Sequence, residues 1–364
     1  MTLTDVVMAI VKVLVLLLLA PLIALVFQYG ERKLLGRMQR RMGPWHVGPM
    51  GLFQAPADAI KLLMKESLTP AKAERWVYLI APFLVVGPTV AVLTGVPFTR
   101  NLVAANLDLG LLYVLALPAV ATIGFVMAGW GSGNKYALIG TARMVAQAIS
   151  YELPLLISVL GVALLAGSLS LTEIVEAQAS TVWYVVVQPT ALAIFIMAGL
   201  AESSRTPFDI AIAESEVIGG PLIEYSGIRW AMFFLAEYVN VFILACLSTV
   251  IFLGGWAGPF LPPILWFAIK AGIIVIFIMW LRGTLPRLRI DQLMALSWKV
   301  LLPLSLLNLV VVSVHAVYGW TPTIPLIPLS VVLGAWYYRR AWRRLVLRPR
   351  PLAPRDLPAQ TAAV

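Results

Sequence analysis

Long apolar runs are the feature that most constrains the fold of this chain. They recur along the whole 364-residue sequence, and each is long enough to cross about 30 Å of hydrocarbon as an α-helix. A membrane β-barrel would show a weaker, alternating pattern, so the runs favour helices. The composition agrees, with 61% hydrophobic and only 12% charged residues. The sequence therefore predicts an all-α, polytopic transmembrane helix bundle.

The bundle is predicted to have eight core spans and a ninth that prolines interrupt. The eight lie near residues 6–29, 77–98, 111–130, 153–169, 183–200, 230–253, 264–281 and 300–317. The ninth, residues 324–342, contains Pro325 and Pro328. It completes a transmembrane domain at 1–342, and a basic tail follows at 343–364.

Basic residues gather in alternate loops, which predicts the orientation. Of the 27 Lys and Arg residues, 24 lie in residues 30–76, 131–152, 201–229 and 282–299 and in the tail from residue 339. The positive-inside rule makes these segments cytoplasmic, with the N-terminus outside and the C-terminus cytoplasmic. That arrangement requires an odd number of helices, which favours nine.

The first cytoplasmic loop, residues 30–76, is predicted to contain an amphipathic helix that begins at Leu52. Helical spacing places Phe53, Ala57, Ile60 and Met64 on one stripe, and Gln54, Asp58, Lys61 and Lys65 on the adjoining one. Such a helix lies at the membrane surface, and its periodicity is equally that of a plain interfacial anchor.

The third loop, residues 131–152, holds three glycines and an amphipathic run, so Glu152 is expected to begin the fourth span. An acid in the first turn of a helix commonly interacts with the helix dipole or caps the helix. However, the adjacent spans are nearly uncharged, and Pro154 can free backbone groups for water. These features favour a functional role for Glu152.

Residues 201–238 concentrate the chemistry of the chain. They hold six of its seventeen acidic residues against two arginines, Arg205 and Arg229. Carboxylates at a membrane edge must be paired, protonated or hydrated. The alternative is that the acids merely pair with nearby arginines, but two arginines cannot neutralise six acids, so the segment predicts proton handling. The six are Glu202, Asp209, Glu214, Glu216, Glu224 and Glu237.

The sequence also predicts the partners of Arg205 and the position of Glu237. Arg205 follows Glu202 by three residues, so the two can pair if the fifth helix continues. Arg205 is also expected to be the only cation near Glu202, Asp209, Glu214 and Glu216. Glu237 should lie about two turns into the sixth span.

Sites for nucleotides, metals and covalent catalysis are not indicated. The sequence has no Walker-type glycine loop, no Cys/His set with metal spacing and no nucleophile with a base. His46 and His315 should lie about a bilayer thickness apart, and Cys246 is the only cysteine. The net charge of +10 is explained by membrane orientation, so nucleic acid is a poor candidate partner.

Six ordered motifs carry a resemblance to a known family, and the resemblance covers roughly residues 6–317. They read ERKLLGRMQRRMGP, VGPMGLFQAPADAIKLLMKE, SYELP, AESSRTPFDIAIAESE, IEYSG and AEY. They resemble the H-type (mitochondrial ND-one) family of membrane subunits of proton-pumping NADH:quinone oxidoreductase, respiratory complex I. The resemblance implies a multi-pass protein of the inner (plasma) membrane, joined to the hydrophilic quinone-reducing module and to antiporter-like membrane subunits. It also implies quinone as substrate, no redox cofactor on this chain, and FMN and iron–sulfur clusters on partner subunits.

The resemblance also implies roles for particular residues. The quinone-chamber candidates are Glu31, Arg32, Arg41, Asp58, Lys61, Arg205, Asp209, Glu214, Glu216 and Glu224. The proton-path candidates are Glu152, Glu202 and Glu237. The family pattern QPxAD reads here as QAPAD at residues 54–58, one residue longer before the proline. The alternatives are a homologous membrane component of a ferredoxin-driven, hydrogenase-type complex and an independent ion transporter. No inverted repeat supports the transporter.

Overall fold

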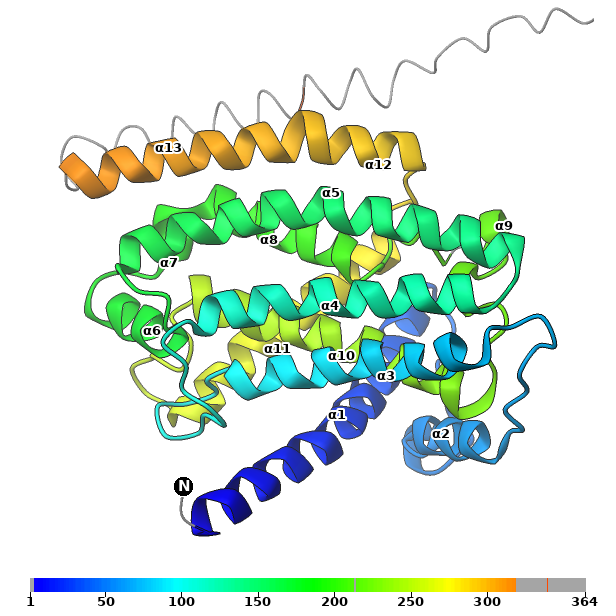
Figure 1. The fold of residues 1–364 in the computed structure, drawn as a ribbon. Helices are drawn as coiled ribbons and strands as arrows, with labels where there is room; N and C mark the ends of the chain where they lie inside the picture. The colour runs from blue at the N-terminus through cyan, green and yellow to red at the C-terminus, as the bar shows by residue number, and fades with distance from the viewer. Residues whose placement is uncertain (1–2, 213, 319–338, 340–364) are drawn as a thin grey trace, which may run out of the picture.

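The chain folds into a bundle of long helices (Figure 1). The computed structural model describes residues 3–212, 214–318 and 339. Within them, seven helical stretches are long and apolar enough to cross a membrane, which confirms the predicted helix bundle. The stretches are α1 (Leu3–Met38), α3 (Arg75–Gly95), α4 (Gly110–Gly131), α5 (Lys135–Ala166), α10 (Gly227–Phe252), α11 (Pro263–Thr284) and the continuous run of α12 (Ile290–Leu296), a π-helical turn (Ser297–Leu301) and α13 (Leu302–Tyr318).

The predicted span at 183–200 is two helices, α7 (Tyr184–Val187) and α8 (Pro189–Glu202). They are separated at Gln188, whose backbone has φ −128° and ψ 58°. Pro189 has no N–H and cannot donate the hydrogen bond that would continue the first helix. At about 1.5 Å per residue, α8 alone is about 21 Å long, which is shorter than the hydrocarbon core.

Helix α5 begins much earlier than predicted. Asn134 caps it by accepting a 2.9 Å hydrogen bond from the Tyr136 N–H, and the helix then runs for 32 residues. Residues 141–152 are therefore helical and are not a loop. Glu152 lies in the middle of α5, so the expectation that it stands in the first turn of its helix is wrong, and the alternative of a cap or dipole partner is removed as well.

The shorter elements lie between the long helices. The predicted amphipathic helix of the first loop is present as α2 (Gln54–Met64), two residues later than the predicted start at Leu52. The predicted ninth span at 324–342 and the tail at 343–364 lie outside the described residues, apart from residue 339. The remaining short elements are α6 (Leu171–Ser180), α9 (Glu214–Val217) and 3₁₀ turns at Pro49–Gly51 and Gly220–Leu222.

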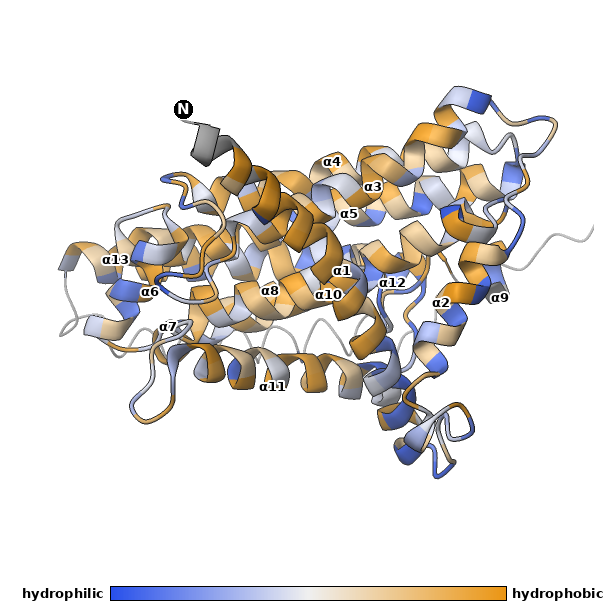
Figure 2. Ribbon diagram, turned by 90° about the horizontal axis from the view of Figure 1, so that it is seen from below, coloured by the Kyte–Doolittle hydropathy of each residue, from blue (hydrophilic) through white to orange (hydrophobic). Residues whose placement is uncertain are grey.

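Helix α10 lies at the centre of the bundle, where most of its residues are buried. Helices α3, α4, α5 and α12–α13 run side by side, while α1 crosses obliquely and contacts α10 and α11 (Figure 1). Hydrophobic residues cover the lengths of the helices, and hydrophilic ones gather toward the end that carries α2 and α9 (Figure 2). This end also carries the acidic segment.

Two glycines allow close approach beside the acidic segment. A methyl group on Gly140 of α5 would collide with the Cα of Gly220, so α5 packs directly on the turn at 220–222. A methyl group on Gly199 of α8 would collide with a Leu244 methyl of α10. The Gly199 contact brings the end of α8, where Glu202 lies, against α10.

Candidate functional site

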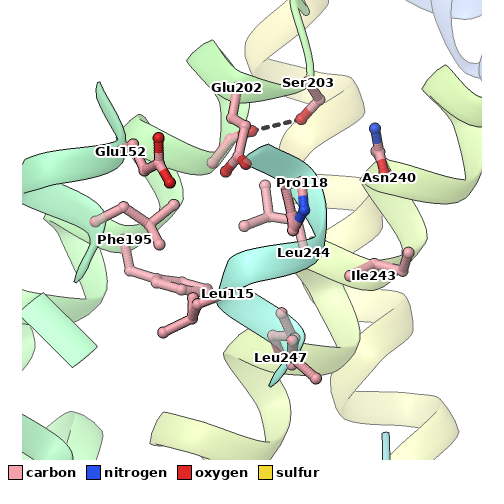
Figure 3. A pocket seen from close by; sticks show the side chains of 13 residues that line it. Leu115, Pro118, Glu152, Phe195, Glu202, Ser203, Asn240, Ile243, Leu244 and Leu247 are labelled. Atoms are coloured by element: carbon pink, nitrogen blue, oxygen red, sulfur yellow. Dashed lines mark hydrogen bonds between the residues drawn. The ribbon is translucent and has the colours of Figure 1, made fainter. Parts of the chain in front are cut away.

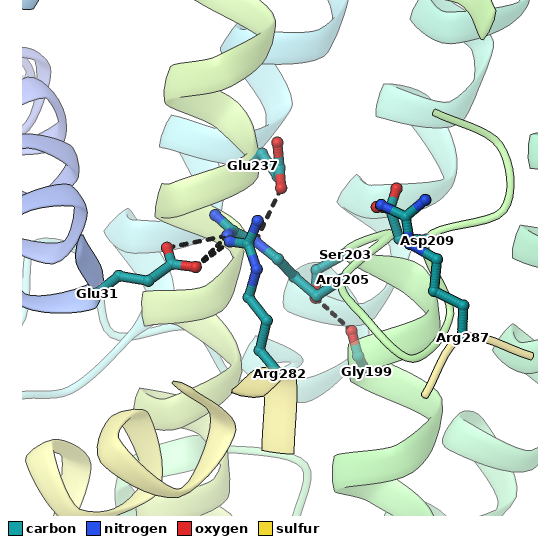
Figure 4. Close-up of polar contacts among 8 residues, drawn as sticks. All are labelled: Glu31, Gly199, Ser203, Arg205, Asp209, Glu237, Arg282 and Arg287. Carbon is teal, nitrogen blue, oxygen red and sulfur yellow. Dashed lines mark hydrogen bonds and ion pairs between the residues drawn. The ribbon is translucent and has the colours of Figure 1, made fainter. Parts of the chain in front are cut away.

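Arg205 lies at the centre of a buried cluster of ion pairs (Figure 4). Helix α8 ends at Glu202, and Ser204 has a left-handed φ of 50°, so the chain turns sharply before Arg205. Arg205 Nη1 lies 3.1 Å from Glu31 Oε2, and its Nε lies 2.8 Å from Glu237 Oε1. The guanidinium also lies over the Tyr238 ring, 4.2 Å from its centroid. One arginine thus joins α1, α10 and the acidic segment.

A second arginine completes this cluster. Arg282, in the last turn of α11, also pairs with Glu31, so two arginines face two glutamates. Burial alone would lower the pKa of Arg205, but the carboxylates of Glu237 and Glu31 raise it above its ordinary value. Arg205 therefore stays positively charged. Among the described residues it forms no ion pair with Glu202, because α8 does not continue to it.

Two other acids of the segment have cations of their own. Asp209 Oδ2 lies 3.0 Å from Nη2 of Arg287, and Glu216 Oε2 lies 2.7 Å from Nη1 of Arg143 on α5. The expectation that Arg205 is the only cation near these acids is therefore wrong. Glu214 is the first residue of α9.

The first-loop helix is tied to α1 by Asp58 on its polar stripe. Arg32 Nη1 donates a 2.6 Å hydrogen bond to Asp58 Oδ2, and Gln54 Nε2 donates to Asp58 Oδ1 at 3.1 Å. Lys61 lies one turn further along α2 and is exposed. The α2 surface is therefore fixed to the helix that carries Glu31.

Two of the chamber candidates lie away from the Arg205 cluster. Arg41 is exposed, and its Nε donates to the side chain of Gln39. Glu224 accepts a 2.7 Å hydrogen bond from Asn134 Nδ2, at the start of α5. The structure therefore does not bring Arg41 and Glu224 together with Glu31, Arg205 and Glu237.

Glu152 and Glu202 face one cavity of about 50 Å³ (Figure 3). Its other polar lining residues are Ser203 and Asn240, and no lysine or arginine of the described chain lines it. About 10–15 Å³ is enough for one water molecule, so the cavity has space for several. Two carboxyl groups facing a few waters without a cation are suited to storing and exchanging protons.

Asn240 connects this cavity to its surroundings. A second cavity, of about 30 Å³, is lined by Glu202, Ser204 and Asn240 among others. Asn240 also follows Glu237 by three residues on α10, so it lies about one helical turn from the Arg205 cluster. Its amide is therefore one of the polar groups that line the cavities beside Glu202, and it lies on the helix that carries Glu237.

Sequence reasoning missed Arg282, Arg287, Arg143 and Asn240. The three arginines lie in the predicted basic loops, where they were counted only to predict the membrane orientation and not as partners of the acids. Asn240 interrupts an otherwise apolar stretch of α10 three residues after Glu237, and this spacing is the signal that identifies it. In the part of the chain that the structure describes, no group of three His, Cys, Asp or Glu side chains is placed to hold a metal ion.

Comparisons with known proteins agree on one family. A family described as NADH dehydrogenase matches residues 11–313. A relative from Dehalococcoides mccartyi (strain CBDB1), the H-type subunit of an NADH-quinone oxidoreductase, is 48% identical over 79% of this chain and 81% of its own length. Proteins of the same name from Brevibacillus brevis and Geobacillus kaustophilus are 49% and 50% identical. They cover 80% and 82% of this chain and 88% and 91% of their own lengths.

Proposed function

Because the chain belongs to the family of H-type subunits of NADH-quinone oxidoreductase, we propose that it couples quinone reduction to proton translocation. It is a multi-pass membrane subunit of an NADH:quinone oxidoreductase, and the other subunits of respiratory complex I are its partners. The proposal concerns the acidic residues. The ion pairs of the Arg205 cluster change in strength when quinone is reduced, and Glu202 and Glu152 transfer protons between them. Electrons reach quinone from FMN and iron–sulfur clusters on partner subunits.

The observation that carries this proposal is the position of Arg205 between Glu31 and Glu237. Glu31 lies on the helix that is tied to α2, and α2 forms part of the proposed quinone entrance. Reduced quinone takes up protons. Any protein group that donates one of these protons changes its charge, which alters the electrostatics around it. A charge change near Glu31 alters how strongly Arg205 is held by Glu31 and by Glu237, because the three share one buried network.

The second half of the path begins at Glu237. One turn further on, Asn240 faces the two cavities that Glu202 also lines. Water in these cavities provides hydrogen-bonded steps between Glu202 and Glu152, whose side chains face the same space (Figure 3). Protons therefore move along α10 and then between α8 and α5. The positive-inside pattern of the basic loops supports a cytoplasmic position for the Arg205 end of this path.

Replacement of Glu202 by Gln in the assembled complex tests the proposal. Gln keeps the size and polarity of the side chain but cannot release a proton, so proton translocation and NADH:quinone reductase rate should fall together. Electron transfer from NADH to a soluble artificial acceptor should persist. The matched control is Glu176→Gln, since Glu176 is half exposed and lies in a surface pair with Arg100.

The same measurements apply separately to Glu152→Gln and Glu237→Gln. A fully assembled Glu202→Gln complex with wild-type rate and proton yield would contradict the proposal. Loss of assembly in Glu202→Gln but not in Glu176→Gln would contradict it as well, because it would assign Glu202 a structural role.

A further inference from the structure

A second polar site lies where the membrane helix breaks between α7 and α8. Gln188 is 1% exposed, and Asn308 of α13 is 4% exposed. Among the described residues, both side-chain amide atoms of Gln188 and the Nδ2 of Asn308 have no hydrogen-bond partner. Buried polar groups normally have partners, and the penalty for leaving them without one is greater in a membrane interior.

The unpartnered atoms converge on one small space. A methyl group placed on Gly161 of α5 would lie 3.2 Å from Gln188 Oε1 and 3.8 Å from Asn308 Nδ2. The two atoms are therefore at most about 7 Å apart, the sum of these distances. They make no hydrogen bond to each other. One water molecule that makes two hydrogen bonds of ordinary length spans up to about 6 Å, a separation that lies within this upper limit.

Neighbouring contacts fix the direction of the Asn308 amide. Thr190 Oγ1 donates a 2.6 Å hydrogen bond to Asn308 Oδ1, so the Nδ2 group is the end left facing Gln188 and Gly161. Asn308 Nδ2 is a donor and Gln188 Oε1 an acceptor, while Gln188 Nε2 adds another donor. A water molecule can donate to the acceptor and accept from a donor at the same time.

We propose that Gln188, Asn308 and the side of Gly161 that faces them form a binding site for ordered water inside the membrane. The water completes the hydrogen bonding at the break before Pro189 and joins α5, α8 and α13. Gly161 is required because a side chain there would occupy the space of the water. The site is separate from the cavity at Glu202 and does not depend on proton coupling.

A high-resolution structure of the assembled complex tests the proposal directly. Density for a water within hydrogen-bond distance of Gln188 and Asn308 is expected. A direct Gln188–Asn308 hydrogen bond, or a side chain from elsewhere in the complex in that space, would overturn the proposal.

Variants give an independent measurement in the same complex. Gly161→Ala should remove the water density and lower the melting temperature of the complex. The matched control is Gly272→Ala on α11, where a methyl group meets no described atom within 4 Å. Asn308→Leu should lower the melting temperature more than the double variant Gln188→Met/Asn308→Leu, because the single change leaves Gln188 without a partner. Equal melting temperatures for Gly161→Ala and Gly272→Ala would reject the site.

Discussion

Arg205 Nη1 lies 3.1 Å from Glu31 Oε2, although 174 residues separate the two in the sequence. Both side chains are almost completely buried, at 5% and 3% exposed. Removing one member of a buried ion pair typically costs about 3–5 kcal/mol, because the other charge remains buried. This pair therefore fixes the acidic segment to the C-terminal part of α1.

Arg205→Lys tests whether the geometry of the cluster matters beyond its charge. Lysine has one ammonium group and cannot hold Glu31 and Glu237 in the way the planar guanidinium does. Loss of one charged hydrogen bond, about 1.5–3 kcal/mol, predicts a roughly ten- to hundredfold lower NADH:quinone reductase rate if it is expressed fully in the barrier. Arg100→Lys, in an exposed pair, serves as the control. An unchanged rate in assembled Arg205→Lys complex would rule out the geometric role.

Asp58→Asn tests the attachment of α2 to α1. The amide can keep a hydrogen bond to Gln54 but loses the ion pair with Arg32. Since this pair is partly exposed, its loss should cost at most about 1 kcal/mol of stability and leave assembly intact. Quinone reduction should fall while electron transfer from NADH to a soluble acceptor persists. Equal loss of both activities would indicate failed assembly and would refute a role at the quinone entrance.

Asn240→Leu tests the polar link between the two cavities. Leucine has a similar size but offers no hydrogen bond to water, so the space beside Glu202 should dry. Quinone reductase rate and proton translocation should both decrease, whereas Asn240→Ser, which keeps a hydroxyl group and leaves space, should retain more of each. Asn106→Leu, at an exposed position, controls for the change in polarity. Identical behaviour of the Leu and Ser variants would contradict a water-ordering role.

Tyr151→Phe addresses stability and not transport. The Tyr151 hydroxyl is buried and donates a 2.9 Å hydrogen bond to the Leu293 carbonyl, which joins α5 to α12. Its loss should destabilise the contact by about 0.5–1.5 kcal/mol and lower the melting temperature of the complex. The rate per assembled complex should stay near wild type. Tyr136→Phe is the control, because Tyr136 is exposed. A melting temperature equal to that of this control would show that the bond contributes nothing.

The apolar runs were sufficient to predict the helices, because a chain in lipid must satisfy its own backbone hydrogen bonds. They did not reveal the break at Gln188, since an apolar run containing one proline is compatible with a continuous helix. The start of α5 was missed for a related reason. Gly131, Gly133 and Gly140 resembled a loop, whereas the Asn134 cap begins a helix directly after Gly133, and Gly140 lies within that helix.

Which arginine pairs with each acidic residue depends on tertiary packing, and tertiary packing cannot be read from a single sequence. Glu31 and Arg282 are 251 residues apart, and only the contact of α1 with α11 brings them together. Local spacing instead suggested Glu202 as the partner of Arg205. Short-range rules apply only where a helix continues, and α8 ends at Glu202. Sequence spacing therefore did not predict how Glu31, Arg205, Glu237 and Arg282 pair with one another.

Because of the π-helical turn at Ser297–Leu301, the number of residues in this part of the chain determines how α13 is rotated relative to α12. A π-turn holds one residue more than an α-turn, and each residue turns a helix by about 100°. Here the turn is held by Ser297, whose hydroxyl donates to the Ser150 carbonyl, and by the Trp298 indole, which donates to the Ser150 hydroxyl at 3.1 Å. Deleting a single residue would rotate Asn308 away from Thr190 while Leu293 kept its place beside Tyr151. Insertions and deletions are thus tolerated less here than in a terminal loop. The five residues of the π-turn set the rotation of the whole of α13 about its own axis.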